Sequence, residues 1–170
     1  MEFSLDILAL LLLYILFFFR KWKIQGKDIL FVNTLLYVYI ACVLFFTLMP
    51  VIPAFPFIFD HPYTPMNMIP FIDVINSYGD FVRQIILNVI MLVPFGFLLP
   101  LTRRKPGFFK VFLLTFLLSL VIELLQPLLH GSRSSDITDL ITNTCGGILG
   151  YLLSLMFNPI STRLLARIKT

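Results

Sequence analysis

The chain has 170 residues, of which 59% are hydrophobic and only 13% are charged. Its mean hydropathy is +0.96. Such a composition excludes an ordinary soluble domain and is typical of an integral membrane protein. The net charge of +4 combines a basic and an acidic side of the expected bundle, so it gives no reason to expect nucleic-acid binding.

Five apolar stretches predict five transmembrane helices. A bilayer core about 30 Å thick needs ~20 apolar residues per helix, and the first stretch is the shortest. The segments between the stretches are too short to form a soluble core, so we expect one all-α membrane domain over residues 1–170. The predicted spans are 5–19, 29–49, 81–101, 108–129 and 137–157.

The basic residues predict the orientation. All but two of the 13 Lys and Arg flank the spans on a single side, which the positive-inside rule places in the cytoplasm. The N-terminus is then outside and the C-terminus inside, with Arg83 and Arg133 as the outer cations. The first stretch lacks both a preceding basic residue and a small-residue cleavage site, so we expect a retained span rather than a signal peptide.

A proline- and aromatic-rich segment, residues 50–83, connects spans two and three. Its six prolines forbid a continuous helix, whereas its aromatic side chains are too apolar for a free loop in water. We expect an outer interfacial or re-entrant loop, with a short helix near residues 71–77. Cys42 and Cys145 fall within predicted spans, where two buried free thiols are expected rather than a disulfide.

Polar residues follow one face of each of the last two predicted helices. Thr115, Ser119, Glu123 and Gln126 lie within an arc of about 80° at 100° per residue. In the next helix an arc of about 100° holds three polar residues followed by three glycines. These are Asp136, Asp139, Asn143, Gly146, Gly147 and Gly150.

The glycines predict close helix packing. Gly146 and Gly150 form a small-xxx-small pattern, which lets two backbones approach, and we expect span four to be the neighbour. Asn88 lies on the face of span three that is expected to turn toward the other helices.

Four motifs occur together in the order of a known family. They are Asn67-Met-Ile-Pro-Phe71, Asn88-x5-Pro94-Phe-Gly-Phe97, Glu123-Leu-Leu-Gln126 and Arg133-x2-Asp136-x2-Asp139-x3-Asn143-x2-Gly146-Gly147. In these motifs the chain resembles the VanZ-like family, with a core over residues 67–151. The resemblance implies a small multi-pass protein of the bacterial plasma membrane, associated with low-level resistance to lipoglycopeptides of the teicoplanin type.

The polar residues permit two interpretations. In one they only pair helices: Arg133 bridges Asp136 or Asp139, Glu123 bonds Asn143 or Asn88, and Asp136 caps its helix. In the other they line an outward-opening pocket. A charge at mid-helix costs ~2.5–3.5 kcal/mol on insertion scales, and glycines alone could pair the helices at less cost. The predicted pocket residues are Asn88, Glu123, Gln126, Arg133, Asp136, Asp139 and Asn143.

An amphiphile would suit a polar pocket at the outer leaflet, and a lipoglycopeptide or a lipid-linked cell-wall precursor has this character. The expected partners are therefore the bilayer and such a molecule. No cofactor is predicted, and His130 with the nearby carboxylates matches no established metal motif. The alternative is an intramembrane enzyme acting on a lipid-linked or phosphorylated substrate, with Glu123 as the general base. We expect binding rather than catalysis.

Overall fold

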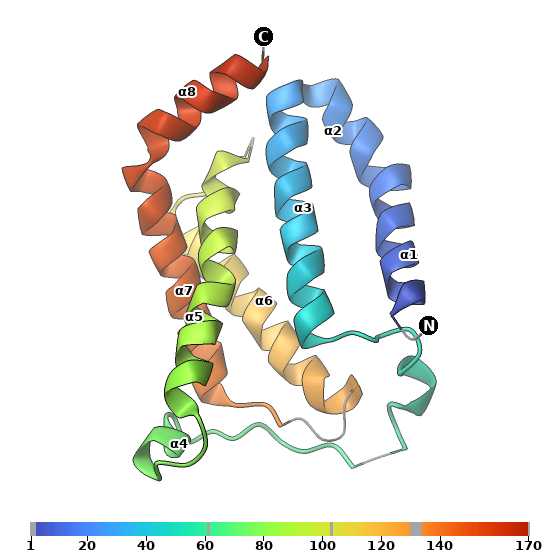
Figure 1. Ribbon diagram of the computed structural model, residues 1–170, viewed down its shortest axis with the longest axis vertical. Helices are drawn as coiled ribbons and strands as arrows, with labels where there is room; N and C mark the ends of the chain where they lie inside the picture. Colours follow the sequence, from blue (N-terminus) through green and yellow to red (C-terminus); the bar gives the residue numbers. More distant parts are fainter. Residues whose placement is uncertain (1–2, 61, 103, 130–133, 170) are drawn as a thin grey trace.

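A computed structural model describes residues 3–60, 62–102, 104–129 and 134–169, and helices make up most of that length (Figure 1). Apart from loops, the described chain adds only an isolated parallel bridge between Asn67 and Asp136. The long helices follow the predicted apolar runs, and α5 and α6 continue through Pro94 and Pro127 without ending there. They are α1 Ser4–Leu13, η1 Tyr14–Phe19, α2 Arg20–Gln25, α3 Lys27–Thr47, η2 Phe55–Phe57, α4 Ile72–Ile75, α5 Phe81–Leu98, η3 Leu99–Leu101, α6 Phe108–Leu129, α7 Ile137–Met156 and α8 Asn158–Lys169.

The first part of the chain is a helical hairpin. Helices α1, η1 and α2 follow one another without a break, and η1 is a π-helical turn. Gly26 then adopts a φ of 129°, which only glycine takes up easily, and reverses the chain into α3. Tyr37 of α3 donates a hydrogen bond of 2.7 Å to the Leu10 carbonyl, so the two arms are joined by a polar contact as well as by aromatic packing.

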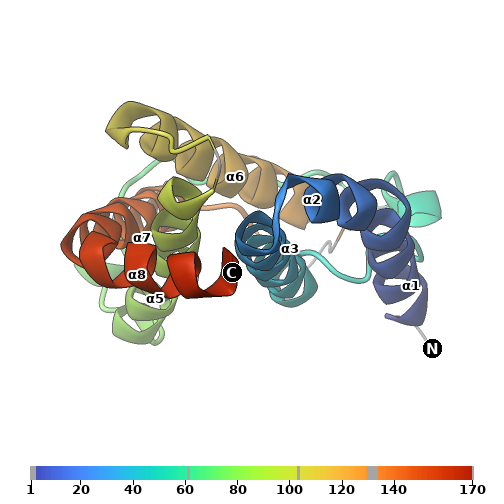
Figure 2. The ribbon, with the colours of Figure 1, turned by 90° about the horizontal axis from the view of Figure 1, so that it is seen from above.

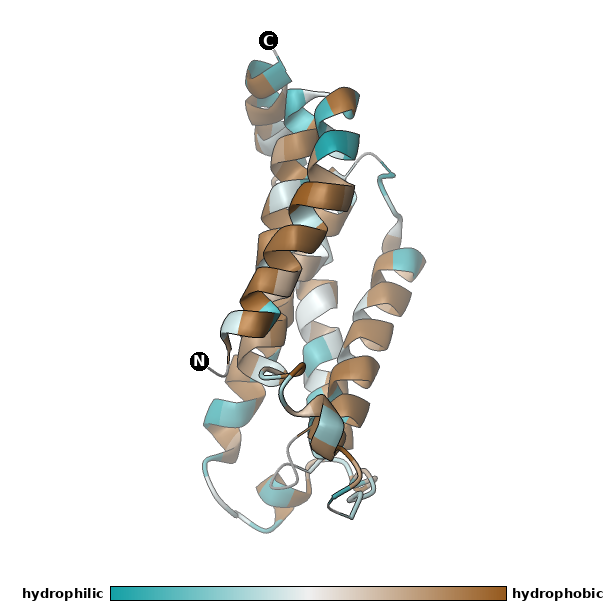
Figure 3. Cartoon of the chain, turned by 90° about the vertical axis from the view of Figure 1, so that its right-hand side faces the viewer, coloured by the Kyte–Doolittle hydropathy of each residue, from teal (hydrophilic) through white to brown (hydrophobic). Residues whose placement is uncertain are grey.

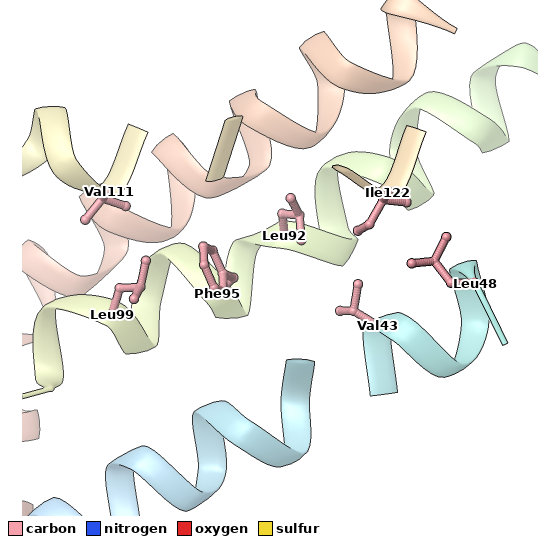
Figure 4. Packing of buried hydrophobic residues seen from close by; sticks show 7 residues of the cluster. All are labelled: Val43, Leu48, Leu92, Phe95, Leu99, Val111 and Ile122. Atoms are coloured by element: carbon pink, nitrogen blue, oxygen red, sulfur yellow. The ribbon is translucent and has the colours of Figure 1, made fainter. Parts of the chain in front are cut away.

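Helices α5, α6 and α7 form the tightest group, and Figure 2 shows α3 between this group and the α1–α2 arm. The space between α3, α5 and α6 is filled by buried apolar side chains of these three helices and of the residues directly after α3 and α5 (Figure 4). They are Val43, Leu48, Leu92, Phe95, Leu99, Val111 and Ile122.

The glycines of α7 do pack against a neighbour, but our prediction of that neighbour was wrong. A Cβ at Gly146 would overlap the carbonyl of Val89, and one at Gly150 would overlap the carbonyl of Val93, so both glycines face α5. Gly147 faces Thr115 of α6 and the backbone at Gly96 of α5. Sequence periodicity defined the face of α7 correctly but could not say which helix it meets.

Of the five predicted spans, length and composition bear out three or four. Within the described residues, three helical segments are long and apolar enough to cross a membrane: α3, α5 continued by η3, and α6. Helices α7 and α8 pass the same test together and are bent by 73°, which would make a fourth. Apolar residues cover the flanks of these helices (Figure 3), and the five-span count stays a prediction.

The two ends of the bundle differ in character. The α2–α3 turn, the end of α5 and helix α8 lie at one end, and α4 with the start of α7 lies at the other (Figure 1). We call the first the basic end, because its described cations include Lys21, Lys27, Arg104 and Arg167.

Both cysteines are free thiols but lie on exposed positions of α3 and α7, so the expectation that Cys42 and Cys145 are buried was wrong.

Candidate functional site

A cavity of about 570 Å³ opens at the α4 end of the bundle. Its volume falls within the roughly 300–1,000 Å³ typical of small-molecule sites. Helices α4, α5, α6 and α7 all contribute to its wall, together with the segment before α7. Its described lining residues are Phe71, Asp73, Val74, Phe81, Gln84, Ile85, Leu87, Asn88, Gln126, Ser134, Asp136, Thr138 and Asp139.

Asp136 organises the start of α7. It is the N-cap residue, and its Oδ1 accepts a hydrogen bond of 2.7 Å from the amide of Thr138, which confirms the predicted cap. Its Oδ2 accepts from the side-chain amide of Asn67 at 3.0 Å. The Asn67 backbone also pairs with this segment, since its N–H donates to the Ser135 carbonyl and its carbonyl accepts from Ile137 N. The long loop is thereby fixed against α7.

The loop continues along the cavity rim. The amide of Phe71 donates to the Thr138 hydroxyl at 2.9 Å, and α4 follows immediately, which confirms the short helix predicted near residues 71–77. Phe71, Asp73 and Val74 therefore contribute to the cavity wall. Sequence reasoning did not include them among the site residues.

A direct polar contact joins α5 to α7 inside the cavity. Asn88 Nδ2 donates to Asp139 Oδ1 at 2.6 Å, and both residues are half-buried. An amide donor to a carboxylate is a charge-assisted hydrogen bond, which is stronger than a neutral one. Asp139 therefore has one oxygen engaged with α5 and stands at the cavity wall.

Glu123 lies behind the wall rather than on it. Glu123 is 2% exposed, and its Oε2 accepts a hydrogen bond from the backbone amide of Asp136 at 3.2 Å. Its backbone carbonyl accepts from the Ser135 hydroxyl. The two pairings that we weighed for Glu123 are not among its described contacts, since Asn88 donates to Asp139 and Asn143 donates to Ser119. Glu123 holds the start of α7 against the end of α6.

The polar stripe of α6 is largely buried against α7. Thr115 and Ser119 have no exposed surface, and Ser119 Oγ accepts from Asn143 Nδ2 at 3.0 Å. Asn143 is 1% exposed and does not line the cavity. Gln126 contacts a different helix: its Nε2 donates to the Thr47 carbonyl of α3 at 3.4 Å, and its side chain also lines the cavity.

The predicted site residues thus separate into two sets. Asn88, Gln126, Asp136 and Asp139 line the same cavity, whereas Glu123 and Asn143 are buried in the α6–α7 interface beneath it. Arg133, the predicted anion contact or carboxylate partner, and His130 lie outside the described residues.

The charged residues in the described lining are all acidic: Asp73, Asp136 and Asp139. A carboxylate wall with amide and hydroxyl neighbours can accept hydrogen bonds from cationic or hydroxyl-bearing groups. Among the described residues, no three His, Cys, Asp or Glu side chains are grouped closely enough to hold a metal ion.

A second buried carboxylate was missed. Asp6 of α1 is 4% exposed, and its two oxygens accept from the amides of Val51 and Ile52, each at 2.9 Å. It therefore fixes the chain just after α3. The signal that could have found it is a single acid beside an apolar run, followed later by prolines that leave amides without helical partners.

Comparison with known proteins places these features in a family. The sequence model of VanZ/LLP1 matches residues 6–158. Protein VanZ of Enterococcus faecium is 38% identical over 96 residues, which make up 56% of this chain and 56% of that protein. The chain thus matches little more than half the length of this relative. No solved structure matches the chain. The family match covers most of the chain and the apolar helices agree with it, so the chain is a helical membrane protein that belongs to the VanZ/LLP1 family.

Proposed function

We propose that the protein modulates the susceptibility of a bacterial cell envelope to lipoglycopeptide antibiotics of the teicoplanin type. In this proposal it binds an amphiphile, either the antibiotic or a lipid-linked cell-wall precursor, at the outer leaflet of the plasma membrane. The polar part of the amphiphile occupies the cavity at the α4 end, and its tail lies against the apolar flanks of the bundle.

One observation carries the proposal: segments far apart in the sequence meet at one cavity. The loop at Asn67–Phe71 pairs with the start of α7, Asn88 of α5 bonds Asp139 of α7, and Gln126 reaches the wall from α6. These segments contain the four motifs of the family resemblance. Pairing of α5 with α7 is already provided by glycine contacts, so a further polar cluster at their ends is costly unless it has another use.

The charge of the wall favours a particular kind of headgroup. Asp73, Asp136 and Asp139 suit a group that donates hydrogen bonds, above all a protonated amine. Both lipoglycopeptides and peptidoglycan precursors combine such polar groups with an acyl or prenyl chain.

The surroundings of the cavity suit an interfacial position. Phe55, Phe57 and Phe59 in the preceding loop are 67%, 61% and 87% exposed, and apolar side chains of this size favour burial at the edge of the bilayer over contact with water. The cations at the opposite end are consistent with that end being cytoplasmic, so the proposal includes five spans with the N-terminus outside.

The test is the antibiotic phenotype of a cavity variant. The chain is expressed in a susceptible Gram-positive host, and minimum inhibitory concentrations of teicoplanin are measured for wild type, Asp139→Asn and Asp60→Asn. Asp60 is an exposed acid of the loop that does not line the cavity, so Asp60→Asn is the matched control.

We expect wild type to raise the inhibitory concentration, Asp139→Asn to abolish the increase, and Asp60→Asn to retain it, at equal protein levels in the membrane. An Asp139→Asn variant that protects as well as wild type refutes the role of the cavity. No protection by wild type refutes the proposed function in this host.

A further inference from the structure

Helix α8 has features of a helix that lies along the membrane surface. It leaves α7 at an angle of 73°, so the two helices cannot both run along the bundle axis. At 100° per residue, Ile160, Leu164, Leu165 and Ile168 fall within an arc of about 140°. Ile160 and Leu164 are each 54% exposed, so this apolar face is only partly covered by protein.

Cations stand at both borders of that apolar arc. On the same helical wheel, Arg163 and Arg167 lie about 60° and 20° outside one border of the arc, and Lys169 lies about 40° outside the other border. Long basic side chains beside an apolar face can extend toward phosphate groups while the face is buried among acyl chains. The arrangement matches helices that bind anionic lipid surfaces.

An apolar groove lies beneath α8. It is a cavity of about 560 Å³ between α3, α5 and α8. Apart from Ser161 and Arg167, all of its described lining residues are apolar: Phe31, Val32, Leu35, Phe97, Leu98, Leu101, Phe157, Ile160, Leu164, Leu165 and Ile168. The groove is suited to a hydrocarbon chain, and its charged lining residue is an arginine.

A second cation stands close to the same groove. A neighbouring cavity shares Phe31, Leu35 and Ile168 with it and is lined by Lys27, the first residue of α3. Asp28 is the next residue of α3 but lines neither cavity. The described charged residues that line these two neighbouring cavities, Arg167 and Lys27, are therefore both basic.

We propose that this groove is a specific site for one anionic phospholipid from the leaflet at the basic end of the bundle. An acyl chain lies between α3 and α5, and the headgroup phosphate contacts Arg167, with Lys27 nearby. A guanidinium has five N–H donors in a planar fork, so it can contact a phosphate oxygen and a protein group at the same time. The bound lipid fills the gap between the α3 hairpin and α5 and attaches α8 to the bundle.

This site is independent of the polar cavity at the opposite end. It uses different residues, a different leaflet and a ligand of opposite charge preference. The failure of either proposal therefore leaves the other standing.

The test compares two arginines of the same helix. Purified protein in detergent is titrated with phosphatidylglycerol or with phosphatidylethanolamine of identical acyl chains, and bound lipid is counted by native mass spectrometry. Arg167 lines the groove and Arg163, one turn earlier, does not, so Arg167→Gln and Arg163→Gln remove the same charge at matched positions.

We expect wild type to prefer one phosphatidylglycerol, and Arg167→Gln to lower its affinity about fivefold while Arg163→Gln retains it. Leu35→Trp, which fills the groove without changing charge, should reduce the binding of both lipids. Equal binding of the two lipids by wild type, or an equal loss in both arginine variants, would overturn the proposal in favour of general surface attraction.

Discussion

Gly150 is the position where the packing of α5 on α7 can be tested most directly. An added Cβ would overlap the carbonyl oxygen of Val93 and lie 2.8 Å from the amide nitrogen of Phe97 and 2.9 Å from the carbonyl carbon of Val93. All three are backbone atoms of α5, so no side chain can rotate away. Gly150→Ala therefore forces the two helices apart.

The size of the effect follows from these distances. Ordinary contact begins at 3.4 Å, so the Phe97 amide alone requires a shift of 0.6 Å, and the Val93 carbonyl requires more. Overpacking in a rigid interior costs about 1–3 kcal/mol, and the upper part of that range is expected where backbone meets backbone. Helix propensity works in the opposite direction, since Ala is favoured over Gly by about 1 kcal/mol in a helix.

The assay is reversible unfolding in mixed micelles by SDS titration, followed by far-ultraviolet circular dichroism. We expect Gly150→Ala to lower the free energy of unfolding by about 2 kcal/mol, the overpacking cost less the gain in propensity. Gly107→Ala is a control for a glycine with free space around it, because a Cβ at Gly107 meets no atom within 4 Å; since Gly107 directly precedes α6, where Ala caps a helix less well than Gly, its effect should stay within about 1 kcal/mol. If Gly150→Ala is as stable as wild type or more so, α5 and α7 do not pack as described.

Three further predictions concern the polar contacts. Asp6→Ala should lower the free energy of unfolding of the α1–α3 part by about 2–4 kcal/mol, because two amide donors lose a buried carboxylate; fluorescence of Trp22, the single tryptophan, reports it. A double-mutant cycle of Asn88→Ala and Asp139→Ala should give a coupling energy of about 1.5–3 kcal/mol in SDS titration, whereas additive effects would mean that the contact is absent. Asp136→Ala should cost about 1 kcal/mol or more, since it removes the cap of α7; Asp136→Asn should keep the cap through its side-chain oxygen but lose the bond from Asn67 Nδ2, so it should recover only part of that stability.

The sequence allowed the helices and their interior faces to be predicted because apolar runs and 3.6-residue periodicity are local properties. The predicted helix at 108–129 has the observed bounds, and that at 137–157 is one residue longer than α7. Helix α8 was not predicted, because its basic residues were interpreted only as a marker of orientation.

Which helices pack against each other could not be predicted, because helical periodicity describes only a single helix. The face of α7 that holds Asn143 and the glycines meets two helices, with Gly146 on α5 and Asn143 on α6. The same limit applied to Glu123, whose carboxylate accepts from the backbone amide of Asp136, a contact that we had not considered. The position of the long loop could not be predicted either, because the bond between Asn67 and Asp136 joins residues that are 69 positions apart in the sequence.

The position of the polar residues along the bundle has a physical reason. Close α5–α7 contact through Gly96, Gly146 and Gly150 makes the middle of the pair a nearly rigid unit. Beyond the last glycine contact toward α4, Asn88 and Asp139 occupy the interface instead, and the helices there are joined by a hydrogen bond rather than by backbone contact. A site placed at this end rests on a rigid base yet stands where water and headgroups can reach it, so its carboxylates avoid the full cost of burial in the bilayer core. The glycines and the carboxylates of α7 therefore depend on each other: separating the helices at Gly150 should loosen the wall that Asp139 forms, and loss of stability in Gly150→Ala should be accompanied by loss of the binding that we propose at the cavity.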